Sequence, residues 1–186
     1  MRTRTILATA TVLACAVPSL ALFQEKECAC KDLPSFSLRG TDGQQYTQGN
    51  IADKATVIVF IAHGCPHNKK AAPDWNRVSK LMGTKARVLG VINTDPATAK
   101  TYAKTLGLSF PLLADKDSKA IEAFGAKHSL DSVLICGKDK RVAKQWEGYS
   151  RTTIGEIFAD LPGHGGPTVK PDLKLFPEKK QSGCSL

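Results

Sequence analysis

The sequence predicts an α/β domain in which a central mixed β-sheet is flanked by helices. Apolar, β-branched runs at 55–62 and 87–93 are separated by an amphipathic stretch at 74–82. This alternation favours parallel strands joined by right-handed crossovers. Later in the chain, the apolar run at 133–136 is followed by a second run at 142–146 across a Gly-Lys-Asp-Lys turn, which predicts an antiparallel hairpin. Parallel and antiparallel pairs together make the sheet a mixed one.

Length and composition fit one globular domain. The 186 residues suffice for a single core, and the hydrophobic content of 42% suits it. The formal net charge is +9, a balance that can indicate nucleic-acid or membrane-surface partners. The lysines are scattered, however, and no aromatic residues are interleaved with them. We therefore expect a solvated basic surface and no nucleic-acid partner.

Residues 1–21 have the pattern of a secretory signal peptide. A basic start is followed by an apolar stretch and by the small residues Ser19 and Ala21, at the spacing that a signal peptidase needs. The stretch is short and contains Pro18, so we expect no stable membrane span. An alternative is a lipobox that makes Cys15 the lipidated first residue. Both alternatives place the domain outside the cytoplasm, in the periplasm or secreted.

Residues 22–32 are charged and lack hydrophobic periodicity, so we expect a flexible segment. It contains Cys28 and Cys30. In order of preference, these two cysteines form a structural or intermolecular bridge, resolve another cysteine, or contribute to a metal site. No second Cys–His pair at matching spacing supports zinc. Without Cys15 the number of cysteines is odd, so at least one is free, mixed or intermolecular.

Residues 33–161 contain the predicted domain, which opens with a β-hairpin extension. Leu38 and Tyr46 flank the turn of this hairpin at 41–43. Cys136 ends a buried strand, where we expect a small core residue rather than a redox partner. The remaining expected elements are helices at 97–106, 118–124 and 152–161 and a short strand at 110–114.

Cys65 lies where the apolar strand at 55–62 gives way to a helix, and Pro66 suits the first helical position. Active sites in such sheets lie at the carboxyl ends of strands. The unpaired N–H groups of a first helical turn favour an anion, and the thiolate is the nucleophilic form of cysteine. Lys69 and Lys70 would add positive potential. We therefore interpret Cys65 as redox-active; the competing interpretation is a small apolar residue in a retired site.

The segment from this strand through Cys65 to Pro73 resembles the active-site segment of the thioredoxin superfamily. That superfamily usually has Cys-x-x-Cys, whereas this chain has Cys-Pro-His-Asn, with Asn68 in place of the resolving cysteine. Dithiol exchange within the motif is therefore excluded. The resemblance implies a thioredoxin-like fold, with Cys65 as the nucleophile and Asn68 orienting the site by hydrogen bonding.

Two further parts of the chain resemble the alkyl hydroperoxide reductase/thiol-specific antioxidant (peroxiredoxin) and redoxin families. One is Leu-Pro-Ser-Phe-Ser-Leu at 33–38 with Asp-Gly at 42–43. The other is Phe-Pro-Leu-Leu-Ala-Asp at 110–115 with Ala-Phe-Gly at 123–125. These matches extend over roughly residues 33–161 and imply a peroxiredoxin-like redoxin.

The chain departs from both families at three positions. Peroxiredoxins carry Pro-x-x-x-Thr/Ser-x-x-Cys, in which a proline-shaped pocket and the hydroxyl help to orient the peroxide. Here Ile58 and Ala62 occupy those two places. Thioredoxins have a cis-proline before the strand at 133–136, and Leu130 holds that position. The resemblance therefore predicts the fold and leaves the reaction open between peroxide reduction and disulfide exchange.

Residues 162–186 are rich in glycine, proline and lysine, so we expect a flexible, solvated tail. Cys184 lies near its end, where core packing is not expected. It resembles the C-terminal resolving cysteines of some peroxiredoxins and redoxins, and an extended tail is long enough to reach the site. The resemblance implies that Cys184, in preference to Cys28 or Cys30, resolves an oxidised Cys65.

The histidines raise the question of a metal, because His63 and His67 flank Cys65. Copper-delivery proteins of the superfamily usually have Cys-x-x-x-Cys, a spacing that the active-site segment lacks. His128 and His164 have no place that the sequence determines. We expect surface or supporting histidines and no metal ligands.

The sequence thus predicts an exported, thiol-dependent antioxidant or oxidoreductase in which Cys65 attacks a peroxide or a substrate disulfide. The expected partners are that substrate and a thiol reductant, and no organic cofactor is implied. The alternative is a non-enzymatic module, either a copper-binding chaperone or an interaction domain with a relic site.

Overall fold

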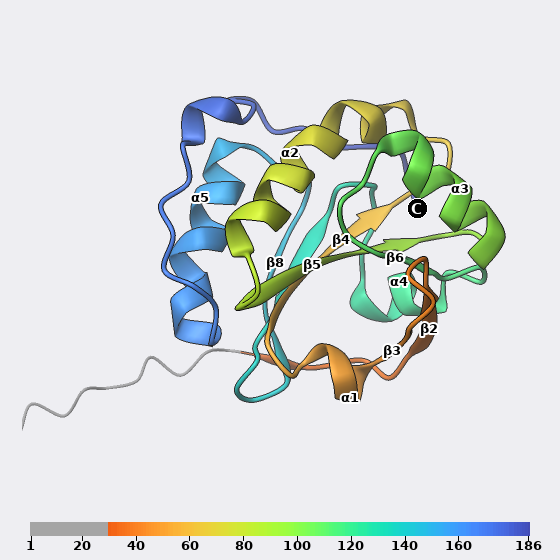
Figure 1. The fold of residues 1–186 in the computed structure, drawn as a ribbon, viewed down its shortest axis with the longest axis horizontal. Coiled ribbons are helices and arrows are strands. Elements are labelled where there is room, and N and C mark those ends of the chain that lie inside the picture. Colours follow the sequence, from red (N-terminus) through yellow and green to blue (C-terminus); the bar gives the residue numbers. More distant parts are fainter. Residues whose placement is uncertain (1–29) are drawn as a thin grey trace, which may run out of the picture.

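An eight-stranded mixed sheet forms the centre of the molecule, with the strand order β1-β8-β7-β4-β5-β6-β2-β3. The computed structural model, drawn in Figure 1, describes residues 30–186. The expected signal peptide and the segment at 22–29 lie outside the described residues. The strands span Lys31–Asp32 (β1), Ser37–Gly40 (β2), Gln45–Thr47 (β3), Ala55–Ile61 (β4), Ala86–Ile92 (β5), Leu112–Ala114 (β6), Ser132–Ile135 (β7) and Arg141–Trp146 (β8).

Strand β4 lies in the middle of the sheet, parallel to β5 and antiparallel to β7. All of its residues are buried because both faces of the sheet are covered, which explains the unbroken apolar run in the sequence. Val57 and Val59 pack into the core on one face, whereas Ile58 and Phe60 pack into the core on the other. The predicted mixed sheet is therefore confirmed.

The helices divide between the two faces of the sheet (Figure 1). Helices α2 (Pro66–Met82), α3 (Pro96–Leu106) and α5 (Arg151–Asp160) cover one face, and α1 (Gln48–Ile51) and α4 (Lys119–Phe124) cover the other. Helix α2 buries Trp75 and Val78 in the first core, while α4 buries Ile121 and Phe124 in the second. This arrangement places the start of α2 directly after the carboxyl end of β4.

The predicted N-terminal hairpin is present as β2 and β3, in which Leu38 pairs with Tyr46. It joins the sheet through antiparallel pairing of β2 with β6. Upstream, β1 forms an edge strand beside β8, within the segment at 22–32 that we expected to be flexible. Both residues of β1 are charged and exposed. Backbone pairing and an exposed ion pair between Asp32 and Arg141 hold them, and neither interaction leaves a hydrophobic pattern in the sequence.

Residues 162–186 pack along the domain, which differs from the flexible tail that we expected. In Figure 1 this segment runs from α5 past α2 to the C-terminal end beside α3. Two 3-10 turns, η1 (Leu161–His164) and η2 (Leu173–Leu175), lie along it. Phe176 is buried in the core, and the Arg77 guanidinium lies 5.5 Å from the centre of its ring. Val169 and Leu173 are partly buried against the same core, but anchors so widely and unevenly spaced produce no hydrophobic periodicity.

Gly90 lies in β5 at a place where neighbouring side chains leave no room. A Cβ atom there would overlap Leu112 Cδ2 and lie 3.2 Å from Ile61 Cδ1. We therefore expect Gly90→Ala to lower the free energy of unfolding by about 1–3 kcal/mol through overpacking. Gly163→Ala is the matched control, because its Cβ would meet nothing within 4 Å. Urea unfolding measures both variants, and equal midpoints would contradict the packing argument.

Candidate active site around Cys65

Cys65 caps the N-terminus of α2, beyond the carboxyl end of β4. Pro66 lies in the first turn of the helix, where its missing N–H costs no hydrogen bond. Gly64 turns the chain between strand and helix with a φ of 78°, a left-handed conformation that glycine adopts without steric cost. The strand, the turn and the helix thus fix the position of Cys65 at the sheet edge where such folds place reactive groups.

Cys65 is joined to Cys184 by a disulfide across a sequence separation of 119 residues. Their Cα atoms are 5.8 Å apart, a typical separation for bridged cysteines. The backbone N–H of Cys184 also donates a hydrogen bond to Cys65 Sγ at 3.0 Å. The structure therefore brings together the two cysteines that the sequence analysis assigns to the nucleophilic and the resolving roles.

The two bridged cysteines differ in exposure. Cys65 is 3% exposed, whereas Cys184 lies on the surface. Helix α2 donates no hydrogen bond to the Cys65 side chain, although we expected its first-turn N–H groups to stabilise the sulfur. A disulfide sulfur carries no charge, so the helix terminus has no anion to bind in this state. The N–H group directed at Cys65 Sγ belongs to Cys184 in the tail instead.

Asn68 is buried in the first turn of α2 and orients the backbone around Cys65. Its Nδ2 donates to the Ala62 carbonyl at 2.8 Å and to the Tyr102 hydroxyl at 3.1 Å. Its Oδ1 accepts a hydrogen bond of 2.6 Å from the Ser129 hydroxyl. These bonds connect the loop before Cys65 to α3 and to the segment before β7. Asn68 therefore acts on the site through its neighbours.

Tyr102 and Ser129 complete this network, and the sequence analysis identified neither. The Tyr102 hydroxyl donates to the Cys65 carbonyl at 3.4 Å, and the Ser129 hydroxyl accepts from the Ala62 N–H at 3.0 Å. A lone tyrosine in a helix and a lone serine in a loop form no motif. The available signal was position: Ser129 directly precedes Leu130, which holds the place of the thioredoxin cis-proline.

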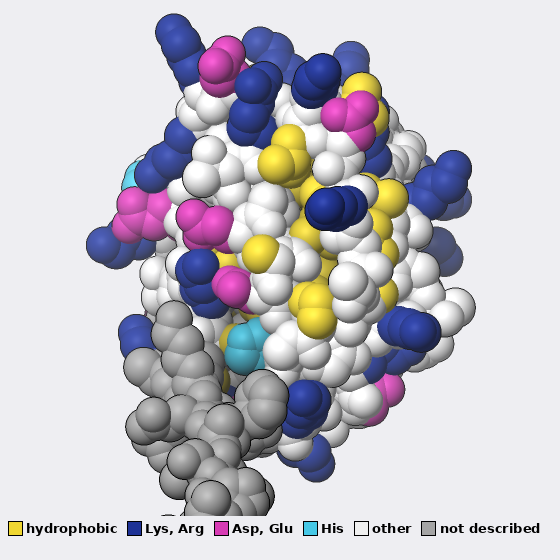
Figure 2. Space-filling view, turned by 90° about the vertical axis from the view of Figure 1, so that its left-hand side faces the viewer, with side chains coloured by type: hydrophobic (Ala, Val, Ile, Leu, Met, Phe, Trp, Pro, Cys, Tyr) yellow, Lys and Arg dark blue, Asp and Glu magenta, His cyan; other side chains and the backbone are white. Residues whose placement is uncertain are grey.

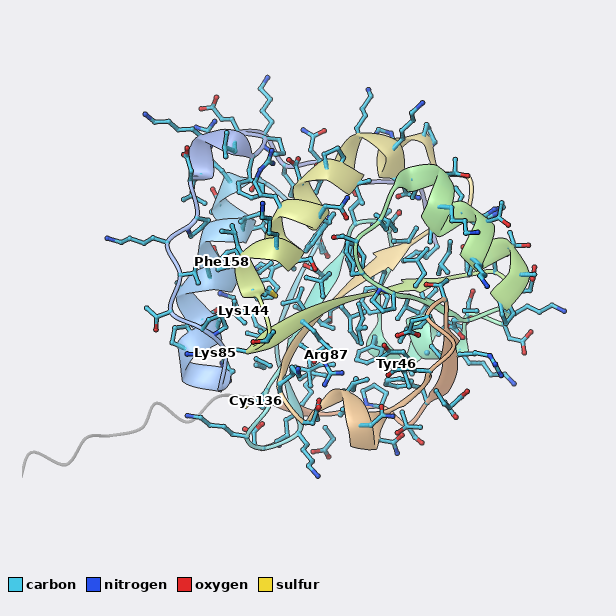
Figure 3. The ribbon with its side chains drawn as sticks, viewed as in Figure 1. Tyr46, Lys85, Arg87, Cys136, Lys144 and Phe158 are labelled. Atoms are coloured by element: carbon cyan, nitrogen blue, oxygen red, sulfur yellow. A yellow bond between two sulfur atoms is a disulfide. The ribbon has the colours of Figure 1, made fainter. Side chains whose placement is uncertain are left out.

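Cys136 lies far from Cys65. It follows β7, which runs antiparallel to β4, so it lies at the opposite end of the sheet, about 20 Å away by the length of β4. Figure 3 labels Cys136 at that end, well away from the start of α2. Its side chain is buried and free, which fits a small core residue.

Cys30 does not lie near Cys65 either. Cys30 is disulfide-bonded and adjoins β1, an edge strand separated from β4 by β8 and β7. Three interstrand spacings amount to about 14 Å. Cys30 is therefore not placed to resolve Cys65 in this structure, and Cys28 lies outside the described residues.

The histidines are dispersed. His63 and His67 are exposed, and the His63 ring packs edge-on against Tyr102 with 5.0 Å between ring centres. His128 pairs with the end of the tail, and His164 lies in η1. Among residues 30–186, no group of three or more His, Cys, Asp and Glu side chains is placed to hold a metal ion.

Known proteins with similar sequences are redox proteins by name. Chloroplastic peroxiredoxin Q of Populus jackii is 30% identical over 105 residues, which cover 54% of this chain and 48% of that protein. The thiol-disulfide oxidoreductase ResA of Bacillus thuringiensis is 28% identical over 125 residues, covering 66% of this chain and 71% of that protein. The chain thus spans about half the length of the peroxiredoxin Q proteins that it matches.

The comparisons also establish the fold and the family. A solved structure of the bacterioferritin comigratory protein of Xanthomonas campestris matches with a TM-score of 0.62 and 20% identity, covering 73% of this chain and 98% of that one. At this identity the likeness concerns the thioredoxin-like fold alone. The model of the AhpC/TSA family matches residues 30–154, a range that includes Cys65 and Asn68 and ends before Cys184. Because that match extends over most of the folded domain, the chain belongs to the AhpC/TSA family.

Proposed function

We propose that this protein is a thiol-dependent antioxidant or oxidoreductase in which Cys65 attacks a peroxide or a disulfide. With a peroxide, the Cys65 thiolate takes one oxygen as the O–O bond breaks, which yields an alcohol or water and a Cys65 sulfenic acid. With a disulfide, the thiolate displaces one sulfur and a mixed disulfide forms. The Cys184 thiolate then attacks Cys65 Sγ and releases water or the substrate thiol. Two equivalents of a thiol reductant regenerate both thiols.

The disulfide between Cys65 and Cys184 is the observation that carries this proposal. A single active-site cysteine needs a second thiol to complete a two-electron cycle, and Asn68 occupies the usual place of that thiol. Cys184 supplies a sulfur from a distant part of the chain. The similarity to peroxiredoxin Q and to ResA supports a thiol redox role, and the two names correspond to the two alternative substrates.

A titration of the reduced protein tests the proposal. One equivalent of cumene hydroperoxide or of glutathione disulfide is added, and the protein is digested with trypsin without reduction. Cleavage after Lys69 and Lys180 places Cys65 and Cys184 in separate peptides. We expect a linked pair of these peptides in proportion to the oxidant, and the faster oxidant identifies the substrate class. Failure of both oxidants to link the peptides would contradict the proposal.

A non-enzymatic module is the second candidate, because two positions lack the peroxiredoxin side chains. Ile58 is fully buried where a proline belongs, and Ala62 provides no hydroxyl. This module would be either a copper-binding chaperone or an interaction domain with a relic site. Alkylation of Cys65 in the reduced protein across pH separates the module from the enzyme. An apparent pKa near the ordinary thiol value of about 8.5 would favour the module.

We also propose an extracytoplasmic location. The signal-peptide pattern at 1–21, or lipidation at Cys15, would deliver the domain to an oxidising compartment, where a disulfide persists. Within residues 30–186, no helix has the length and apolarity needed to cross a membrane. On the face shown in Figure 2, lysine and arginine side chains are spread out rather than gathered in one patch, which supports a solvated basic surface.

A further inference from the structure

The last residues of the tail pair with the segment before β7 through an isolated antiparallel β-bridge and backbone hydrogen bonds. His128 and Ser185 form the bridge between the two segments. Three backbone hydrogen bonds of 2.8–3.0 Å join them: Gly183 N–H to Ser129 C=O, Ser129 N–H to Cys184 C=O, and Leu186 N–H to Lys127 C=O. Backbone pairing therefore holds the tail on both sides of Cys184, separately from the bond between the sulfur atoms.

Further anchors fix the tail upstream of Cys184. Tyr149 and Gln181 exchange a reciprocal pair of backbone hydrogen bonds of 2.9 and 2.7 Å. The Arg151 N–H donates to the Pro177 carbonyl at 2.8 Å, directly after the buried Phe176. Each of these contacts is independent of the disulfide. The tail therefore approaches Cys65 along a defined path, with little free chain between one anchor and the next.

Gly183 lies so close to the partner segment that only glycine fits. A Cβ atom at this position would lie 2.6 Å from Ser129 Cβ and 2.8 Å from Ser129 O. Neither atom belongs to the movable end of a long side chain, so a substitution would force the two segments apart. Gly163, in the same tail, has open space around it and provides a matched control.

Ser129 connects the docked tail to the active-site loop. Its backbone pairs with Gly183 and Cys184, while its hydroxyl, which is fully buried, donates to Asn68 Oδ1 and accepts from the Ala62 N–H. One residue thus sets the position of the tail relative to the loop that carries Cys65. The hydroxyl hydrogen thus satisfies the Asn68 oxygen, and the hydroxyl oxygen satisfies the Ala62 N–H.

We propose that residues 181–186 stay docked on residues 127–129 after the disulfide is reduced, with Ser129 as the positioning residue that holds Cys184 next to Cys65. This inference rests on the proposed function, in which Cys184 resolves an oxidised Cys65. A docked thiol has a much higher effective concentration than a thiol on a freely moving tail. The resolving step then needs only a local adjustment of the two sulfur atoms.

The equilibrium between the disulfide and the dithiol tests this docking. The full-length protein is equilibrated in buffers of oxidised and reduced dithiothreitol, alkylated, and analysed through the peptide at 181–186. We expect Gly183→Ala and Ser129→Ala to shift the equilibrium toward the dithiol on the order of tenfold, and Gly163→Ala to stay within about twofold of wild type. A purely structural role of Ser129 would lower thermal stability and leave this equilibrium unchanged. Equal equilibria for Gly183→Ala and Gly163→Ala would overturn the inference.

Hydrogen exchange of the unmodified chain gives a second test that no folding defect can obscure. In the reduced wild-type protein, we expect the amides of Gly183, Cys184 and Leu186 to exchange more slowly than those of an unstructured peptide of the same sequence. Exchange at the unstructured rate would show that reduction releases the tail, and would overturn the inference. Neither test requires turnover, so the failure of the peroxide titration alone would remove the proposed function and leave the docking intact.

Discussion

The Cys65→Ser variant is expected to lose peroxide or disulfide reduction on the order of a thousandfold or more. A serine hydroxyl is not ionised at neutral pH and forms neither a sulfenic acid nor a mixed disulfide, so the first step has no nucleophile. Steady-state consumption of cumene hydroperoxide or glutathione disulfide, with dithiothreitol as the electron donor, measures the loss.

Cys136→Ala is the matched control for this variant. Cys136 is a free thiol that lies buried at the opposite end of the sheet, so its removal is expected to leave turnover within about twofold of wild type and to affect stability instead. Undiminished turnover in Cys65→Ser would contradict the assignment of the nucleophile. A large loss of turnover in Cys136→Ala would show that a second thiol takes part.

The Cys184→Ser variant is expected to separate oxidation of Cys65 from its resolution. The first step needs only Cys65, so one equivalent of peroxide still oxidises it. Without the docked thiol, the sulfenic acid accumulates and becomes vulnerable to further oxidation. We expect turnover to fall on the order of a hundredfold, because an intramolecular step is replaced by a bimolecular one. Dimedone labelling of Cys65, read by mass spectrometry, detects the trapped intermediate.

The outcome that would contradict this assignment is resolution of Cys65 by Cys28 or Cys30. If Cys184→Ser keeps full turnover and its Cys65 peptide is found linked to Cys28 or Cys30, the resolving role belongs to the N-terminal pair. If dimedone does not label Cys65 in Cys184→Ser and no link to Cys28 or Cys30 is found, the assignment of Cys184 is also contradicted. Serine retains the backbone N–H that approaches Cys65 Sγ, so the variant removes the thiol and little else.

The centre of the fold was predictable because its causes are local. The strand β4 is a continuous apolar run, and α2 repeats its apolar residues at helical spacing. Gly64 and Pro66 mark the turn between them and place Cys65 at the helix start. Each of these features depends on a few adjacent residues, so the sequence alone reveals the strand, the helix and the candidate nucleophile.

The surroundings of Cys65 depend on contacts between distant residues. Asn68 was recognisable by its place in the motif, but its partners Tyr102 and Ser129 lie 34 and 61 residues away. The path of the tail likewise follows from one buried aromatic, Phe176, and from backbone hydrogen bonds. Its glycines, prolines and lysines predicted a solvated chain. Composition of this kind indicates the conformation of a segment in isolation. It does not reveal the contacts with a neighbouring surface that order the segment.

In the proposed cycle, the unequal exposure of Cys65 and Cys184 predicts which sulfur atom the reductant attacks. An incoming thiolate must approach in line with the bond that it breaks, and of the two bridged residues Cys184 is exposed whereas Cys65 is buried. The reductant is therefore expected to attach itself to the tail, while the sulfur of Cys65 departs as the leaving group. That leaving group emerges as an anion at the start of α2, where we expect the positive end of the helix dipole to stabilise it. The reactive thiolate is thus restored in place, and the reductant never has to enter the interior.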